Sequence, residues 1–305
     1  MIDIKSFNSL IELTDAFPTE EVCLKYLESL IWEDGVVSPF DPESKVYVCS
    51  NNRYICKNTG KSFNVKTGTV FENTKLPLRK WFMAIWLVLS HKKGISSLQL
   101  SRDIKVTQKT AWFMLQRIRE CLMCKNEGRL ENEVEADETF VGGKNKNRHK
   151  DKKVKKCQGR SFKDKTPVLG MGERKGEVVT RVIKSTSRSE ITPIIQQFVD
   201  KRAVLYTDEW GGYDEIDKSY YHYTVDHGKG QYVNGRIYTN TIEGFWTGLK
   251  RGYIGIYHYM SPKHLQRYAN EFTFRYNTRK VSDFHKFNLL LCNIKYRITY
   301  KQLIA

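Results

Sequence analysis

Three acidic residues, far apart in the chain, could together carry out phosphodiester chemistry. Asp137 lies in a strand-like run, Asp208 directly follows another, and Glu243 lies in a segment with helical periodicity. Carboxylate oxygens are ligands that Mg²⁺ prefers, and two such ions about 3.5–4 Å apart can activate an attacking oxygen and stabilise a leaving one. Lys250 follows Glu243 by seven residues, about two helical turns, so both side chains are expected on one helix face. Lys250 could then contact a phosphate beside the acid.

The segments that carry these acids predict an α/β region over residues 131–252. Apolar alternation and turn residues predict strands at 134–141, 167–173, 177–183, 203–206 and 220–225. The second and third of these would form a hairpin around Arg174-Lys175-Gly176. Helical periodicity predicts helices at 190–201 and 239–251. The acids would therefore lie on the first strand, after the fourth strand and on the last helix.

The N-terminal part is expected to hold a small ribbon followed by a helix-turn-helix. A short helix is predicted at 19–31, two or three antiparallel strands within 45–72, and helices at 79–91, 96–103 and 107–121. Thr107 is a candidate N-cap of the third of these helices. Gln108, Lys109 and Thr110 would then face a major groove. Three short helices with another role would give the same pattern.

Charge is distributed unevenly along the 305 residues. The chain has 51 Lys and Arg against 34 Asp and Glu, or +17, and its first fifty residues carry −7. Residues 144–165 alone carry +9, which indicates a polyanionic partner. A solvated loop would show the same charge run. Within this run we expect a DNA-clamping arm beside Asp137, with Lys152, Lys153, Lys155 and Lys156 as contacts, and Arg251 as a further phosphate contact.

Other features exclude some classes of protein. The longest apolar stretch, 81–89, is far below the roughly 20 residues that a bilayer requires, so no membrane partner is expected. The N-terminus shows no signal-peptide pattern. Seven cysteines at scattered spacings are typical of reduced thiols in a cytosol. A cytoplasmic protein is therefore expected.

At these residues the chain resembles the bacterial insertion-sequence DDE transposases that have an ISXO-type transposase domain. The resemblance covers about residues 19–281. It rests on EADETFVGG, LYTDEWGGY, KTGTVFENTKLPLRKWFMAIW, VTQKTAWFMLQRIR and, most specifically, YVNGRIYTNTIEGFWTGLKRGYIGIYHYMSPKHLQRYANEFTFRYNTR. It implies a ribonuclease-H-like core, a Mg²⁺-dependent cut-and-join reaction on DNA ends, and a helix-turn-helix that binds terminal inverted repeats. It also implies a homo-oligomeric synaptic complex in the bacterial nucleoid and target DNA as a second substrate.

The resemblance also assigns roles to residues. Asp137, Asp208 and Glu243 match the metal-binding triad for two Mg²⁺ ions, with Mn²⁺ as a substitute, and Lys250 matches the trailing basic residue. Related groups use Asn or His in place of the third acid, so Asn240 is a candidate second-shell or substitute ligand. His227 is a candidate contact to the scissile phosphate or water, although a lone His more often has a structural role.

The chain departs from the family in one module. The family often begins with a zinc ribbon of two Cys-x-x-Cys pairs, but the corresponding positions here hold Ser38, Asp41, Cys56 and Thr59. Structural zinc requires four such donors in a tetrahedral arrangement, so we expect no zinc. The ribbon would instead be held by apolar packing, with contributions from Tyr47, Tyr54, Phe63 and Phe71.

These observations predict a domain order and leave two other functions open. The predicted divisions are a ribbon-like module at 1–78, a helix-turn-helix at 79–130, a ribonuclease-H-like domain at 131–285 and a basic tail at 286–305. A non-catalytic DNA-binding regulator would have no need for the acids and the lysine. A nuclease that cuts without joining would share the acids but would not need a separate end-recognition module.

Overall fold

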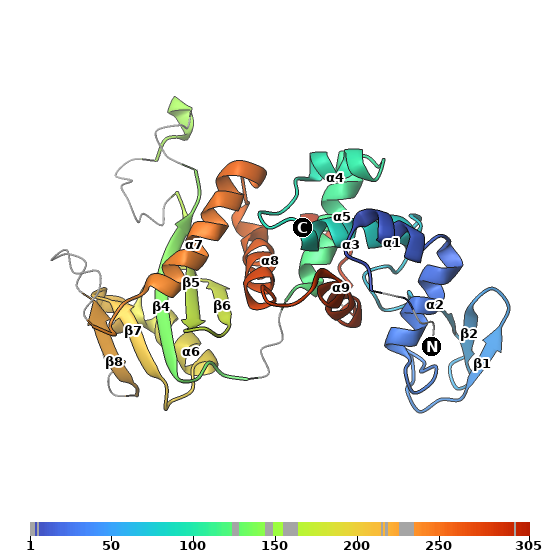
Figure 1. Cartoon of the computed structure of the whole chain (residues 1–305), viewed down its shortest axis with the longest axis horizontal. Coiled ribbons are helices and arrows are strands. Elements are labelled where there is room, and N and C mark those ends of the chain that lie inside the picture. Colours follow the sequence, from blue (N-terminus) through green and yellow to red (C-terminus); the bar gives the residue numbers. More distant parts are fainter. Residues whose placement is uncertain are drawn as a thin grey trace. The chain divides into compact units, whose positions relative to one another are not determined.

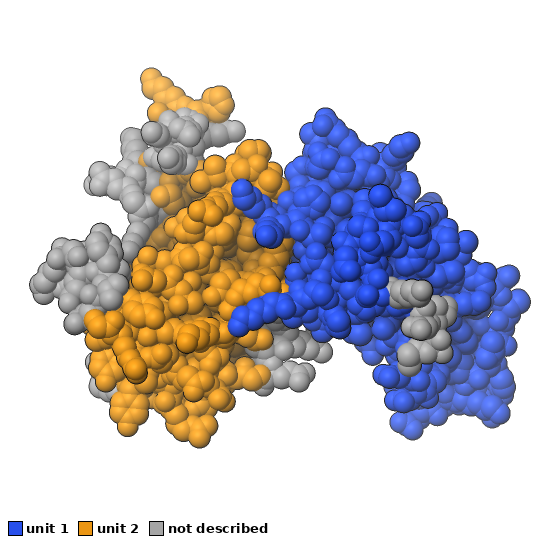
Figure 2. Space-filling view, viewed as in Figure 1, with its two compact units in different colours: residues 1–122, 280–305 blue, residues 123–279 orange. Residues whose placement is uncertain are grey.

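The computed structural model describes residues 4, 6–123, 128–143, 149–154, 164–214, 216, 219–225, 235–295 and 297–305. Two compact units divide the chain (Figure 2): unit 1 combines residues 1–122 with 280–305, and unit 2 holds residues 123–279. In the ranges described, none of the helices is both long and apolar enough to cross a bilayer. Each unit is described separately below.

Unit 2 is built on a five-stranded mixed sheet (Figure 1). Its strands are β4 (Glu133–Val141), β5 (Thr166–Glu173), β6 (Val178–Val182), β7 (Val204–Asp208) and β8 (Tyr221–Val225). They lie in the order β6-β5-β4-β7-β8, in which β4, β5 and β6 are antiparallel neighbours and β7 and β8 run parallel to β4. The predicted α/β region and its five strands are confirmed, with boundaries that shift by two residues at most.

Helices cover both faces of this sheet. Helix α6 (Arg188–Phe198) packs on one face, where its apolar side chains share a core with Val134 and Ala136 of β4. Helices α7 (Asn240–Gly252) and α8 (Leu265–Asn277) pack on the other, together with Val141 of β4. Because successive strand side chains point to opposite faces, β4 contributes to both cores and is the central strand of the unit.

Helix α7 approaches the sheet closely because β5 has a glycine beneath it. Gly170 pairs directly with Asp137 of β4. A Cβ atom added at Gly170 would lie 2.4 Å from the buried indole ring of Trp246 and 2.8 Å from Ile242. The missing side chain therefore sets the distance between α7 and the strand pair that carries Asp137.

Unit 1 is mostly helical and includes a three-stranded antiparallel ribbon. Its elements are α1 (Leu10–Ala16), α2 (Glu20–Ile31), β1 (Val46–Cys49), β2 (Arg53–Cys56), β3 (Ser62–Phe63), α3 (Leu78–Ser90), α4 (Ser97–Asp103), α5 (Gln108–Cys121), α9 (Asp283–Cys292) and α10 (Tyr300–Ile304). The predicted helices and small strands are confirmed, whereas α1 was not predicted.

The ribbon core differs in part from the prediction. Tyr54 and Phe63 are buried together with Cys56, as expected for a ribbon held by apolar packing. Tyr47 is 45% exposed, because its β1 neighbour Val46 is the residue that faces this core. Phe71 is fully buried but packs on Trp81 of α3. The expected contributions of Tyr47 and Phe71 to the ribbon core are therefore wrong.

The C-terminal residues pack within unit 1. Phe287 of α9 is fully buried and its ring lies 5.3 Å from that of Phe82 on α3, with Phe7 and Phe17 in the same aromatic cluster. Residues 286–305, which the sequence suggested as a basic tail, contain most of α9 and all of α10. This segment contributes apolar side chains to the unit that also carries α4 and α5.

Replacement of Gly170 by Ala should loosen the packing of α7. The added methyl group has no room beneath Trp246, so we expect Gly170→Ala to lower the free energy of unfolding by about 1–3 kcal/mol. Gly244→Ala is the matched control, because a Cβ at that exposed α7 position meets nothing within 4 Å. The control should be neutral or stabilising by up to about 1 kcal/mol. Calorimetric unfolding of both variants tests this, and equal Tm values would contradict it.

Candidate active site

The start of α7 is held by a buried carboxylate from the central strand. Glu135 of β4 is fully buried, and its Oε2 accepts hydrogen bonds from the backbone N of Thr241 at 2.7 Å and of Ile242 at 3.1 Å. Its Oε1 accepts a further bond from the Thr241 hydroxyl at 3.0 Å. The first N–H groups of a helix have no partner within the helix and carry partial positive charge, so a carboxylate there stabilises it. Glu135 thus fixes the start of α7 to β4.

An arginine holds this carboxylate in turn. Arg174, in the turn after β5, donates from Nε to Glu135 Oε1 at 2.8 Å. Its other nitrogens donate to the backbone oxygens of Arg236 at 2.9 Å and Tyr238 at 2.8 Å, just before α7. The guanidinium group also lies 4.1 Å from the ring centre of Tyr206 and 3.7 Å from that of Tyr238. The charge of Glu135 is therefore compensated on several sides, and the segment that enters α7 is tied to the sheet.

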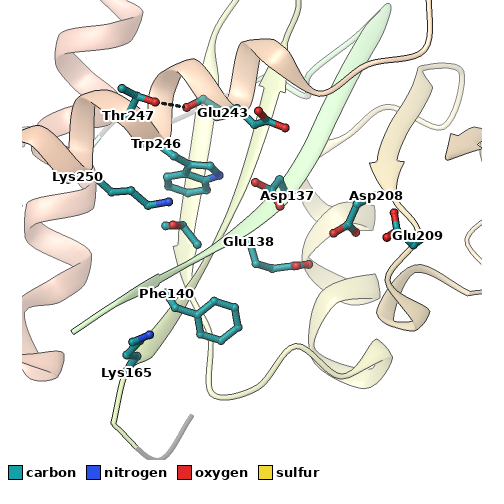
Figure 3. Close-up of a pocket in the computed structure, with 11 residues that line it drawn as sticks. Asp137, Glu138, Phe140, Lys165, Asp208, Glu209, Glu243, Trp246, Thr247 and Lys250 are labelled. Atoms are coloured by element: carbon teal, nitrogen blue, oxygen red, sulfur yellow. Dashed lines mark hydrogen bonds between the residues drawn. The ribbon is translucent and has the colours of Figure 1, made fainter. Parts of the chain in front are cut away.

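This arrangement places the three predicted acids around one cavity (Figure 3). The cavity has a volume of about 550 Å³. Asp137 enters it half-buried from β4, Asp208 is buried at the end of β7, and Glu243 is exposed on the first turn of α7. Lys250, two turns further along α7, lines the same cavity, as predicted from the spacing. Lys165, at the start of β5, contributes a second cation.

Two further acids line the cavity that the sequence had not placed there. Glu138 and Glu209 each directly follow a predicted triad acid in the chain, and both line the cavity (Figure 3). Glu138 is buried and accepts a hydrogen bond from the hydroxyl of Tyr213. Because Asp137 and Glu138 are consecutive strand residues, their side chains lie on opposite faces of β4, and the cavity takes in both.

The buried Tyr213 reports how concentrated the negative charge is. Burial raises the pKa of Tyr213 well above its ordinary value, and the charges of Glu138, Asp137 and Asp208 raise it further. One hydroxyl therefore senses three carboxylates from two strands. Carboxylate oxygens are the type of donor that hard divalent cations such as Mg²⁺ prefer. Within the described ranges, however, no three His, Cys, Asp or Glu side chains already form a metal-holding group.

Two further predicted site residues, Asn240 and Arg251 of α7, do not line this cavity. Asn240, the first residue of α7, is exposed and does not line it; Thr239 instead donates its hydroxyl to Glu243 Oε1 at 3.0 Å. Arg251 is exposed on α7. Lys152 ends a short 3₁₀ turn (Lys150–Lys152) and Lys153 is exposed. His227, Lys155 and Lys156 fall outside the described residues.

Unit 1 holds the predicted DNA-reading residues at the start of α5. Helix α4 and α5 are joined by a short connector in which Lys105 has φ = 49°, and Thr107 caps α5 by accepting from Thr110 N at 3.2 Å. Gln108 and Lys109 are exposed, while Thr110 is half-buried. The Lys109 ammonium lies 5.0 Å from the ring centre of Tyr300 on α10. The two residues with the longest polar side chains are thus open to a partner.

Comparison with known proteins identifies the family of the chain. The sequence profile of the ISXO2-like transposase domain matches residues 129–277. An uncharacterized protein in transposable element ISH50 of Halobacterium salinarum is 30% identical over 272 residues, covering 85% of this chain and 91% of the relative. The chain belongs to the insertion-sequence transposase family with an ISXO2-like domain. An uncharacterized transposase-like protein of Haemophilus influenzae is 27% identical over 108 residues, covering 35% of this chain and 86% of that protein.

Sequence reasoning missed the residues that position the three predicted acids. Glu135 precedes Asp137 by two residues, so a strand puts both on the same face, next to α7. This two-residue spacing could have indicated the role of Glu135, because a charged residue on a covered face of a sheet needs a partner. Arg174 and the glycine beneath Trp246 gave no comparable signal, since their partners are more than thirty residues away in the chain.

Loss of the Glu135 charge should destabilise unit 2 far more than loss of the Glu133 charge. Glu135→Gln places an amide against two helix N–H groups and Arg174, so we expect a loss of roughly 3 kcal/mol in the free energy of unfolding. The control Glu133→Gln weakens a 3.3 Å contact of the same Arg174 from a side chain that is 38% exposed, and should cost below about 1 kcal/mol. Urea unfolding measures both, and equal losses would contradict the positioning role.

Proposed function

We propose that the chain binds the terminal inverted repeats of an insertion sequence and performs Mg²⁺-dependent cleavage and strand transfer at Asp137, Asp208 and Glu243. The observation that carries this proposal is the convergence of three acids from β4, β7 and α7 on one cavity that also holds Lys250. The family membership supports DNA as the substrate. A regulator that only binds DNA would not require this cavity.

The topology of unit 2 supports a ribonuclease-H-like core. An antiparallel set of three strands is extended by two strands parallel to the first, in the order β6-β5-β4-β7-β8. Two acids lie on the neighbouring central strands β4 and β7, which pair in parallel, and the third lies on the helix packed over β4. Such a core brings acids from distant sequence positions to one edge of the sheet.

We assign the metal ions to the carboxylates of Asp137, Asp208 and Glu243 rather than to that of Glu138, which already accepts a hydrogen bond from Tyr213. Glu138 is engaged by Tyr213, whereas Asp137 and Glu243 face the cavity from the sheet and the covering helix (Figure 3). When bound, Mg²⁺ supplies stabilisation of charge on the phosphate and activation of the attacking oxygen. Thr239 donates a hydrogen bond to Oε1 of Glu243, so a metal ion held by that oxygen would replace this hydrogen bond.

The basic residues of the cavity would position DNA. Lys250 and Lys165 lie at the end of the cavity away from Asp208 in Figure 3, where they can contact phosphate oxygens on either side of the reacting one. Water would attack first, and the freed 3′-OH would then attack target DNA. The proposal requires no covalent link between protein and DNA. Assembly of two or more copies on paired ends is part of the same proposal.

The ribbon of unit 1 is proposed to fold without zinc. Ser38, at a position where a ligand cysteine would lie, accepts hydrogen bonds from the backbone N of Phe40 at 3.2 Å and of Asp41 at 3.4 Å. Burial acts to raise the pKa of Cys56, but hydrogen bonds with Ser38, Ser44 and Thr59 outweigh it and lower the pKa to about 6. Polar contacts among these side chains would take the place of a metal.

Neutralisation of any triad acid should abolish chemistry and spare binding. We expect Asp137→Asn, Asp208→Asn and Glu243→Gln each to lower strand transfer by at least about 10³-fold, because each removes a carboxylate from the cavity. Incubation of labelled terminal-repeat duplex and plasmid with and without Mg²⁺ measures binding, cleavage and joining separately. The control Glu209→Gln removes an exposed acid of the same cavity and should retain activity.

The outcomes of that assay separate the alternatives. Joined product that depends on Mg²⁺ and on all three acids supports the transposase mechanism. Cleavage without joining would indicate a nuclease, and binding without cleavage would indicate a regulator. Full activity of any one triad variant would remove that residue from the catalytic set.

Substitutions at the start of α5 should separate base reading from phosphate contact. Gln108→Ala should weaken binding of the terminal repeat by about 1–3 kcal/mol while leaving random duplex unaffected. Lys109→Ala should weaken both and lower the salt dependence by about one unit of slope. Gln99→Ala on α4, where the side chain bonds Asp103, is the control. Equal effects of all three substitutions would contradict the helix-turn-helix assignment.

A further inference from the structure

A second cavity adjoins the acid cavity at the C-terminal end of α7. It measures about 450 Å³, within the range of ligand sites, and shares Phe140, Lys165 and Lys250 with the acid cavity. Its other lining residues include Leu249 of α7, Tyr253 and Ile254 directly after α7, and Val141 at the end of β4. The two cavities therefore lie next to each other along α7.

The walls of the second cavity combine ring and apolar surfaces with cations. Phe140, Tyr253 and Ile254 offer apolar area, and Lys165, Lys250 and His258 offer basic groups at its margin. Of the described residues that line it, none is acidic, in contrast to the adjoining cavity. Aromatic rings stack on nucleobases and basic groups contact phosphates, so this combination suits a nucleotide.

The backbone after α7 is built to present these side chains. A π-helix (Tyr253–Tyr257) follows α7 and is closed by a bond from His258 N to Tyr253 O at 2.7 Å. His258 itself has φ = 56°, a conformation that residues other than glycine rarely adopt. Tyr257 is anchored on α8, where its hydroxyl donates to Glu271 at 2.6 Å and its ring lies 4.9 Å from that of Tyr268. With Tyr257 held in this way, Ile254 remains 69% exposed.

The distance between the acids and the second cavity corresponds to a short stretch of DNA strand. Eleven residues separate Glu243 from Ile254, which corresponds to about 16 Å along a helix axis. A stacked strand advances about 3.4 Å per nucleotide, so the acids and the second cavity lie within a few nucleotides of each other. A phosphate at the acids and a base in the second cavity can therefore belong to one strand.

We propose that the second cavity binds a nucleotide with an unpaired base, within a few nucleotides of the phosphate held by the acids. This inference rests on the function proposed above and identifies the form in which the DNA end is held. Duplex pairing and stacking hide the faces of the bases, so apolar walls can act only on a base that has left the stack. Lys165 and Lys250, common to both cavities, would contact the backbone between the reacting phosphate and that base.

Binding of altered DNA ends by the full-length chain tests this proposal. Fluorescence anisotropy without divalent metal measures Kd for three terminal-repeat duplexes: one fully paired, one unpaired over about five nucleotides beside the cleavage position, and the same with those nucleotides abasic. Stacking of one base makes the unpaired end bind roughly ten-fold more tightly than the abasic end. Tyr253→Ala removes this difference, and the abasic end binds wild type and variant alike.

Two further variants separate this role from damage to the fold. Ile254→Asp changes an exposed cavity residue, introduces a negative charge beside the proposed nucleotide, and removes the same preference without loss of thermal stability. Tyr259→Ala removes an aromatic ring that is 66% exposed but does not line the cavity, and retains the wild-type preference.

The outcomes distinguish this proposal from the proposed function. Equal Kd values of wild type for unpaired and abasic ends overturn the nucleotide site while leaving end recognition intact. A preference that persists in both Tyr253→Ala and Ile254→Asp also overturns it, because the base then lies elsewhere. Failure of wild type to bind any terminal-repeat duplex more tightly than random duplex overturns the proposed function and this inference together.

Discussion

The bond between Glu135 and the first turn of α7 is the constraint on which the rest of the site depends. A buried carboxylate costs several kcal/mol unless it is paired and hydrogen-bonded. Here two backbone N–H groups, the Thr241 hydroxyl and Arg174 compensate it. Because Glu135 and Asp137 lie on the same face of β4, the bond that fixes the helix also fixes Glu243 relative to Asp137. The glycine beneath Trp246 then sets how closely the helix lies on the sheet.

The acid cavity combines charges that repel one another when no cation is present. Glu138, Asp137 and Asp208 act on one buried tyrosine hydroxyl, which shows that their fields overlap. A rigid sheet and a helix fastened at its N-terminus can hold such groups close together at a cost to stability. The same repulsion makes the cavity suited to a divalent cation, with Lys165 and Lys250 set apart toward the end where DNA phosphates would lie. Stability and function are therefore opposed at this edge of the sheet.

Much of this arrangement follows from local sequence patterns. Alternation and turn residues located the strands of unit 2 within two residues. The spacing of Glu243 and Lys250 predicted one helix face, and both residues line one cavity. Contacts between distant segments were beyond such patterns: the cap from Glu135, the clamp by Arg174 and the reach of Glu138 toward Tyr213 depend on how strands and helices meet. The π-helix after α7 was also missed; within it, Tyr257 donates a hydrogen bond to Glu271 of α8, a contact with a later helix that no local pattern shows.

The central claim is that Asp137, Asp208 and Glu243 form one metal-dependent centre. Anomalous X-ray scattering from crystals of the full chain with a terminal-repeat duplex and Mn²⁺ tests it directly. The predicted result is one or two Mn²⁺ peaks within about 2.5 Å of carboxylate oxygens from all three residues. Bound DNA with no Mn²⁺ peak at these carboxylates, or with Mn²⁺ held by other residues, would contradict the claim.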